Sequence, residues 1–155
     1  MPFLIPVLKQ GFLDIIINPP NNPLDAARKM AQAYADYAKP AASLFGPAVF
    51  TGNEVNVMAN VLAGGFNPLG AAPAAAGGLV GGIQAFWTAP PVVFGAGAAV
   101  AFVGGPALGS CLNGSFTNPR IPAGAAAGKL ATCFDVATRL VQVVSGAPPF
   151  TSFLI

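Results

Sequence analysis

The chain has no histidine and few charged residues, and these two absences exclude most catalytic and nucleic-acid-binding classes of protein. Histidine is the usual general base near neutral pH and a common zinc ligand, so Ser-His-Asp and Cys-His catalytic arrangements are excluded. Charged residues make up only 8% of the 155 residues, against roughly 25% in ordinary soluble domains. The formal net charge of +2 is too small and too scattered for a nucleic-acid-binding surface.

The charged residues are unevenly distributed along the chain. Seven of the twelve lie in the first 39 positions, and none lies between Glu54 and Arg120. Exposed surface normally carries charged side chains, so we expect neighbouring protein subunits or lipid to cover the central part of the chain. Disorder is not expected, because 54% of the residues are hydrophobic and disordered chains are poor in such residues.

The remaining polar residues form no recognisable catalytic or cofactor-binding motif. Asp25 and Asp36 lie eleven residues apart on one predicted helix, about 16 Å along its axis, which is too far for an acid/base pair. The segment Gly124–Lys129 has one residue too few between its glycines for a Walker A loop, and Leu130 stands where that loop requires serine or threonine. We therefore expect a protein that is not an enzyme, with no catalytic, cofactor-binding or metal-binding residues.

The two cysteines, Cys111 and Cys133, fall on two neighbouring predicted helices, so a disulfide bond between them is geometrically conceivable. Buried free thiols are the favoured alternative, because Cys133 occupies a position where the rest of the chain has the small residues Ala33 and Gly82. Two cysteines alone cannot form a metal site.

Three passages of the chain repeat with a period of about fifty residues. The repeat is seen when Asn18, Asn67 and Asn118, each followed by proline, are aligned without a gap. Residue character then matches eight, twelve, fifteen and sixteen positions further on, in the sets Ala26/Ala75/Ala126, Met30/Leu79/Leu130, Ala33/Gly82/Cys133 and Tyr34/Ile83/Phe134. This self-similarity predicts a threefold internal repeat, and we expect the aromatic residues at and near these helix positions to form the core: Tyr34, Tyr37, Phe86, Trp87 and Phe134.

Four glycines lie in the interior of one predicted helix, at Gly77, Gly78, Gly81 and Gly82. Each is about 1 kcal/mol less favourable than alanine inside a helix. We therefore expect another helix to approach this one closely, because a glycine has no side chain to hold a neighbour away.

The predicted fold class is mainly α: one domain of three repeated αα-hairpin units with Gly/Pro-rich connectors and extended terminal arms. The three units cover residues 7–40, 53–89 and 106–145, and the arms cover residues 1–6 and 146–155. Short strands are expected only near Val92–Phe94 and Val100–Val103.

The two terminal arms are the predicted contact sites. Both are apolar, and prolines exclude a helix in the C-terminal arm. A free apolar arm would be an exposed hydrophobic peptide, so we expect the arms to dock on neighbouring subunits; the alternative is that they fold back onto the chain itself. The predicted interface residues are Phe3, Leu4, Ile5, Phe150, Phe153, Leu154 and Ile155.

An alternative hypothesis is a small integral membrane protein, holin-like or channel-like. Leu69–Trp87 and Val92–Leu112 are each about long enough to span a bilayer. Both are dominated by alanine and glycine, however, and neither has the flanking basic residues that set membrane orientation. The first residues lack the cationic lead of a secretory signal. A second alternative is a helical domain that binds a ligand between its hairpins.

The repeated pattern of Phe, Asn-Pro, a linker and an Ala-rich helix with aromatic residues, from Phe66 to Trp87 and from Phe116 to Phe134, resembles virion structural proteins of large tailed bacteriophages. The resemblance covers roughly residues 10–145. It implies a non-enzymatic, self-assembling component of a tail, baseplate, neck or capsid. Such a subunit would contact its own copies and other virion proteins, without nucleic acid or a cofactor. Its location would be the virion, assembled in the host cytoplasm.

Overall fold

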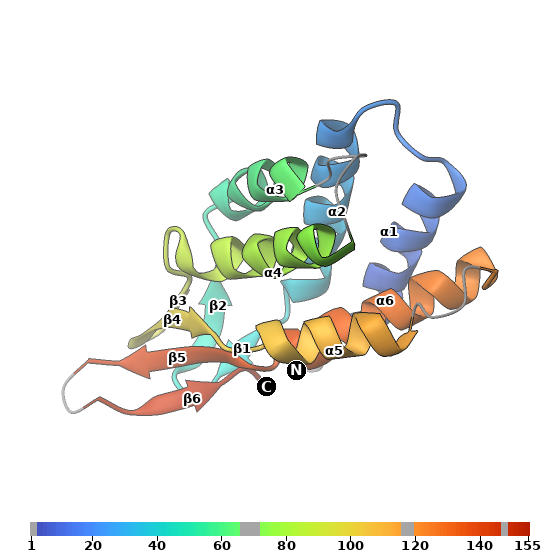
Figure 1. Cartoon of the computed structure of the whole chain (residues 1–155). Coiled ribbons are helices and arrows are strands. Elements are labelled where there is room, and N and C mark those ends of the chain that lie inside the picture. The colour runs from blue at the N-terminus through green and yellow to red at the C-terminus, as the bar shows by residue number, and fades with distance from the viewer. Residues whose placement is uncertain (1–2, 66–71, 116–119, 147–148) are drawn as a thin grey trace.

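The computed structural model describes residues 3–65, 72–115, 120–146 and 149–155. Within these residues the chain forms six helices and six strands, and the order of two helices followed by two strands occurs three times (Figure 1). The helices are α1 (Ile5–Ile17), α2 (Pro23–Ala38), α3 (Asn53–Gly65), α4 (Ala72–Thr88), α5 (Gly105–Ser115) and α6 (Ala123–Thr138). The strands are β1 (Ala42–Ser43), β2 (Gly46–Val49), β3 (Val93–Phe94), β4 (Gly97–Phe102), β5 (Val141–Ser145) and β6 (Thr151–Phe153).

Local sequence explains where the best-defined helix begins. Asn22 precedes α2 in an extended conformation, and its side-chain oxygen accepts a hydrogen bond of 2.8 Å from the backbone N–H of Asp25. Pro23 occupies the first turn, where its missing N–H is not needed, and the carboxylate of Asp25 lies at the positive end of the helix dipole.

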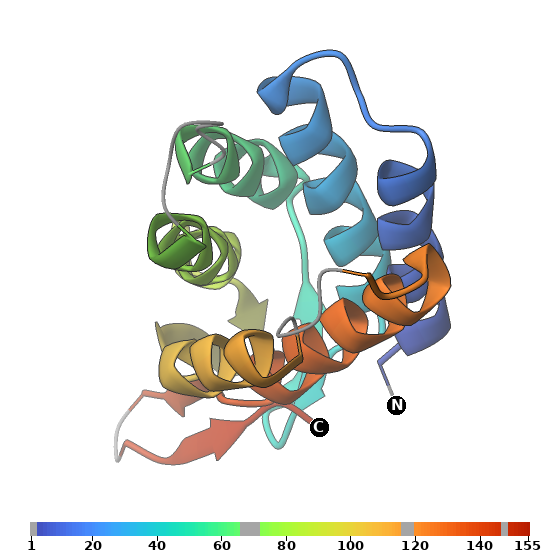
Figure 2. The same cartoon turned by 45° about the vertical axis from the view of Figure 1, so that its right-hand side comes forward.

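The three helix pairs are arranged in a ring around one core (Figure 2). The second helix of each pair packs on the first helix of the next: α2 on α3, α4 on α5, and α6 on α1. The core aromatic residues predicted from the sequence are confirmed, because all five are almost completely buried.

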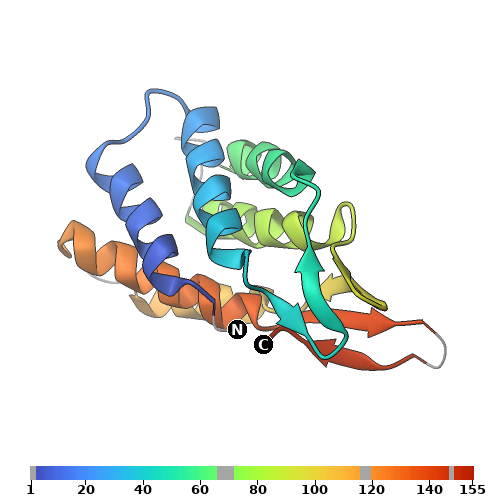
Figure 3. The ribbon, with the colours of Figure 1, turned by 180° about the vertical axis from the view of Figure 1, so that it is seen from behind.

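The six strands form one antiparallel sheet in chain order, from β1 to β6. The first two hairpins have the same two-residue turn, closed by the pairs Ser43/Gly46 and Phe94/Gly97. The sheet curls until its ends meet, since the backbone N–H of Ile155 donates a 3.0 Å hydrogen bond to the carbonyl of Ala42 in the first strand. All strands lie at one end of the molecule, with the helices at the other (Figure 3).

The predicted fold class, mainly α with three αα-hairpin units, is wrong: the chain is mixed α and β, and each helix pair is followed by a strand hairpin. Strands β3 and β4 lie at or near the two places where short strands were predicted. The other four strands were not predicted, because strands of two to five residues are too short to show a clear alternation in the sequence: β1 and β2 lie in a predicted connector, β5 in the third predicted helical unit and β6 in the predicted C-terminal arm. The predicted extended arms are also wrong, since α1 begins at Ile5 and residues 151–153 form β6. The Asn-Pro pairs at 67–68 and 118–119 lie outside the described residues.

Cys111 and Cys133 form a disulfide bond that joins α5 to α6, with a Cα–Cα distance of 5.5 Å. The preference for free thiols was therefore wrong. The small-residue position of Cys133 is buried, as that argument required, but the partner cysteine lies on the adjacent helix within bonding distance, which the repeat alone does not reveal.

The expected close approach of a helix to the glycines of α4 is confirmed. A Cβ atom added to Gly78 would lie 2.9 Å from the Cα of Gly65 in α3, and one added to Gly82 would lie 2.7 Å from a methyl group of Leu62. A Cβ atom on Gly77 would meet nothing within 4 Å. Only some of the glycines are thus required by packing.

This difference between adjacent glycines gives a matched test. We expect Gly78→Ala to lower the free energy of unfolding by about 1–3 kcal/mol, because the new methyl group would collide with backbone that cannot move aside. Gly77→Ala should instead raise it by up to about 1 kcal/mol through helix propensity. Urea denaturation of both variants measures the two changes, and equal effects would contradict the packing of α3 on α4.

Candidate functional site

The N-terminal residues predicted as contacts mostly fold back onto the chain. Phe3 is buried and its ring stacks on Tyr37 with centroids 4.9 Å apart. The guanidinium of Arg139 lies 5.3 Å from the centre of the same ring. Ile5 packs against the core, and Leu4 is exposed. Of this group, Leu4 is the side chain that a partner could reach.

The C-terminal residues divide between the two faces of the sheet. Ser152 and Leu154 point inward and are buried, whereas Phe150, Phe153 and Ile155 are exposed. This alternation follows from the pleat of β6, which pairs with β5 along its whole length. The C-terminal segment is therefore part of the body, but it still presents three large apolar side chains outward.

These outward side chains belong to a larger apolar surface, which we call the outer sheet surface. It consists of seven exposed side chains on the strands and their turns, each 43 to 78% exposed: Leu44, Val49, Val93, Val100, Phe150, Phe153 and Ile155. Strand pairing brings two of these side chains together, because Val49 faces Val93, which in turn faces Ala98. The row continues from Ala98 to Val144 and Thr151.

The outer sheet surface lies on strands that carry no charged residue. None of the six described strands contains a charged residue, and all twelve charged residues lie in helices or in the segments that flank them. The seven side chains together expose roughly 300–600 Å² of apolar area, which matches the largest patch of a typical monomer, and such patches are often functional. The outer sheet surface is therefore a candidate interaction site.

A buried polar cluster lies at the centre of the helix ring. The Nε1–H of Trp87 donates a 2.8 Å hydrogen bond to the hydroxyl of Tyr34, which lies 2.7 Å from the hydroxyl of Thr138. Thr138 donates its own proton to the carbonyl of Phe134, so Tyr34 donates to Thr138. Burial raises the pKa of Tyr34 far above its ordinary value, so the phenol stays neutral. Every donor in the cluster is satisfied, and the cluster joins three helices.

The adjacent polar group, on α2 and α6, is also structural. The hydroxyl of Tyr37 donates a 2.8 Å hydrogen bond to the Asp135 carboxylate, and the Nε–H of Arg139 donates to its other oxygen at 3.0 Å. Burial raises the pKa of Tyr37 well beyond the physiological range. The hydrogen bond with Asp135 raises the pKa of Arg139. The carboxylate is thus held by two residues, Tyr37 and Arg139.

The buried carboxylate of Glu54 closes the start of α3. It accepts hydrogen bonds from the backbone N–H of Thr51 at 2.9 Å, from the Thr51 hydroxyl at 2.9 Å and from the backbone N–H of Gly52 at 2.8 Å. Burial by itself raises the pKa of Glu54, but these hydrogen bonds outweigh it and leave the pKa below its ordinary value. Glu54 therefore stabilises a turn as a carboxylate and is not a proton donor.

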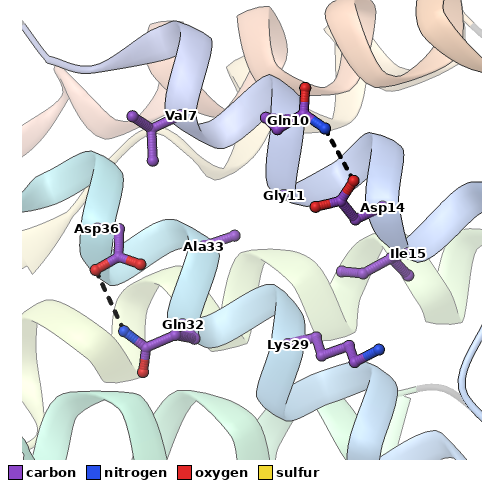
Figure 4. Close-up of a pocket in the computed structure, with 9 residues that line it drawn as sticks. All are labelled: Val7, Gln10, Gly11, Asp14, Ile15, Lys29, Gln32, Ala33 and Asp36. Atoms are coloured by element: carbon purple, nitrogen blue, oxygen red, sulfur yellow. Dashed lines mark hydrogen bonds between the residues drawn. The ribbon is translucent and has the colours of Figure 1, made fainter. Parts of the chain in front are cut away.

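A groove of about 480 Å³ lies between α1 and α2 (Figure 4). Four of its polar side chains are paired along their own helices: Gln10 donates to Asp14 at 2.9 Å, and Gln32 donates to Asp36 at 3.3 Å. Lys29 also lines the groove. Asp36 also bonds Lys39 at 2.7 Å. The groove lies within the first helix pair, so it does not bear on the predicted alternative of a ligand site between hairpins.

The part of the chain that the structure describes contains no group of three cysteine or carboxylate side chains that could hold a metal ion. Among its helices, none combines the length and the apolar character needed to cross a bilayer.

No protein-family model matches the chain, and no curated protein or solved structure is significantly similar to it. The function must therefore be argued from the molecule's own surface.

Sequence reasoning found only part of that surface. It identified Phe150, Phe153 and Ile155, but it missed the aliphatic side chains of the first two hairpins. A sequence signal for the second hairpin was present around Gly95, which has a φ of 56° and lies in the tight turn between β3 and β4. A glycine between two short apolar runs is typical of a hairpin.

The role of Glu54 predicts a specific pH dependence. Because its pKa is lowered in the folded protein, the stability it contributes is present above the ordinary value of 4.5 and is lost as the pH falls below it. We expect Glu54→Gln to remove this part of the acid destabilisation. Urea denaturation of both proteins between about pH 7 and pH 3 measures the difference, and parallel curves would contradict the role.

The central cluster predicts a large effect of a small change. Thr138→Val leaves the buried hydroxyl of Tyr34 without its acceptor, so we expect the free energy of unfolding to fall by about 1–3 kcal/mol. Thr132 is the matched control, since it lies on the same helix and makes the same bond to a carbonyl four residues earlier but is exposed. Thr132→Val should change stability by less than about 0.5 kcal/mol in thermal or urea denaturation. Equal losses in the two variants would argue against the cluster as a central support.

Proposed function

We propose that the chain is a non-enzymatic structural subunit that joins a large protein assembly through its outer sheet surface. The observation that carries this proposal is the separation of charge: the strands present exposed apolar side chains and no charge, while every charged residue belongs to the helical end. An isolated domain gains nothing from exposing such a surface to water, whereas an assembled subunit buries it.

The energetics favour burial in an assembly. Covering the exposed half of one valine or phenylalanine side chain contributes about 1 kcal/mol, so the seven side chains together contribute several kcal/mol for each copy. Association opposes this gain with a cost of roughly 4–15 kcal/mol. Contacts of this size are therefore sufficient for stable association when each subunit is held by several neighbours.

The resemblance to virion proteins of tailed bacteriophages favours one class of assembly. We propose that the particle is a virion and that the subunit belongs to its tail, baseplate, neck or capsid, in contact with further copies and with other virion proteins. The proposal accounts for the neutral central segment of the chain, of which β3 and β4 form a part.

The test is assembly of the purified chain. We expect sedimentation without detergent as large particles, visible as rings, tubes or sheets by electron microscopy. Val93→Lys should prevent this assembly, because it places a charge in the middle of the outer sheet surface. Val136→Lys is the matched control, since Val136 lies on α6 and has the same exposure of 47% as Val93.

Two outcomes would contradict the proposal. A chain that stays monomeric at high concentration, with Val93→Lys and Val136→Lys behaving like the parent protein, would exclude assembly through this surface. Recovery only in the presence of detergent would favour the membrane alternative. Circular dichroism of each variant shows whether the fold is retained.

A further inference from the structure

The helix α5 has a small buried face and one covalent bond to its neighbour α6. Its side chains are described up to Gly114, and two of them are buried, Leu108 and Leu112. By comparison, α6 buries seven. With eleven residues, α5 is also shorter than the helices that are stable by themselves in water. It therefore depends on its neighbours to remain in place.

A glycine in the interior of α5 weakens it further. A Cβ atom added to Gly109 would meet nothing within 4 Å, so packing does not require a glycine there. Inside a helix, glycine makes helix formation about fivefold less favourable than alanine does. Nothing in the packing around Gly109 offsets this loss, in contrast to Gly78 of α4, which lies against the backbone of α3.

The helix α5 also forms the least extensive link of the helix ring. Of the three contacts between successive helix pairs, the contact of α4 with α5 is the smallest among the described residues. The central junction of Tyr34, Trp87 and Thr138 joins α2, α4 and α6 and includes no residue of α5. The helix α5 can therefore leave the ring while the junction holds the other three helices together.

The disulfide bond between Cys111 and Cys133 secures α5 against this opening. It joins α5 to α6 across a sequence separation of 22, and a bond that closes a loop of this length favours the closed arrangement about 100-fold. The two cysteines differ in access, because Cys133 is completely buried and Cys111 is partly exposed. A small reagent in solution can thus reach the bond from the Cys111 side while α5 is in place.

We propose that α5 is a redox-controlled flap, closed on the helix ring by the Cys111–Cys133 disulfide and released when that bond is reduced. In the reduced protein α5 opens and closes as a local unit. The open form exposes Cys133 and the apolar side chains of Leu108 and Leu112. The flap does not include the outer sheet surface, so it goes beyond the proposed function and does not depend on it.

The chemistry of opening is thiol–disulfide exchange with a small thiol such as glutathione. The thiolate of one molecule attacks the sulfur of Cys111, which breaks the protein disulfide and releases Cys133 as a thiolate that takes up a proton. A second thiolate attacks the glutathione sulfur of the mixed disulfide and releases Cys111, which also takes up a proton. The protein gains two electrons and two protons, and the two thiols become one disulfide. Glutathione disulfide reverses each step.

Hydrogen exchange of the whole chain tests the flap. We expect glutathione to make the backbone amides of α5 exchange about 100-fold faster, and glutathione disulfide to restore their protection. The amides of α2 and α6 around Tyr34 and Thr138 should stay protected in both states. The double variant Cys111→Ala/Cys133→Ala should show the fast exchange of α5 whether or not a thiol is present.

Alkylation of Cys133 by iodoacetamide gives a second, matched test. In the variant Cys111→Ala, Cys133 is a buried thiol that reacts only when α5 opens. Adding Gly109→Ala should slow this reaction about fivefold, because it strengthens α5. Adding Gly77→Ala should leave the rate unchanged, since Gly77 has equally open space but lies on α4. Equal slowing by both would mean that Cys133 reacts through unfolding of the whole chain, which overturns the flap.

Three other results would also overturn it. The first is two free thiols in the protein treated with glutathione disulfide. The second is protection of α5 that is the same before and after reduction, and the third is loss of protection throughout the chain on reduction. None of these results bears on assembly through the outer sheet surface, which the comparison of Val93→Lys with Val136→Lys decides separately.

Discussion

The hydrogen-bonded junction of Tyr34, Trp87 and Thr138 is the contact on which the rest of the structure depends. Its three members are fully buried and come from α2, α4 and α6, one from each helix pair. A buried polar group without a partner is strongly destabilising, so the three helices are held in the one arrangement that satisfies all the donors. Each of these helices leads within a few residues into a strand hairpin. The junction therefore also determines where the three hairpins begin.

The sheet that follows from this arrangement carries no charged residue on either face. Its inner face packs into the core through Phe94, Ala99 and Val143, and its outer face carries exposed valine, phenylalanine and isoleucine side chains. An antiparallel sheet in a monomer normally turns one polar face to water. The departure from that rule, together with the absence of charge from every described strand, is the physical basis for treating the sheet as the assembling end of the molecule.

Several features were predictable because they depend on neighbouring residues or on the repeat. The buried set Tyr34, Ile83 and Phe134 follows from helix periodicity at a fixed repeat distance. The close contact of Gly78 with Gly65 follows from the unfavourable placement of glycine inside a helix. Strands were predicted near β3 and β4, but the other four were not, since a segment as short as β1, with two residues, shows no clear alternation. Segments of that length form strands only when partners from elsewhere hold them in place.

Short-range features account for the helices, the buried aromatic positions and the uneven distribution of charge, because caps, helix periodicity and composition act over short distances. Only the folded chain establishes the pairing of six short strands, the disulfide between Cys111 and Cys133, and the burial of Phe3 and Leu154. It also determines which apolar side chains remain exposed to solvent. These features depend on contacts between residues far apart in the chain, and such contacts exist only after the three helix pairs have closed into a ring.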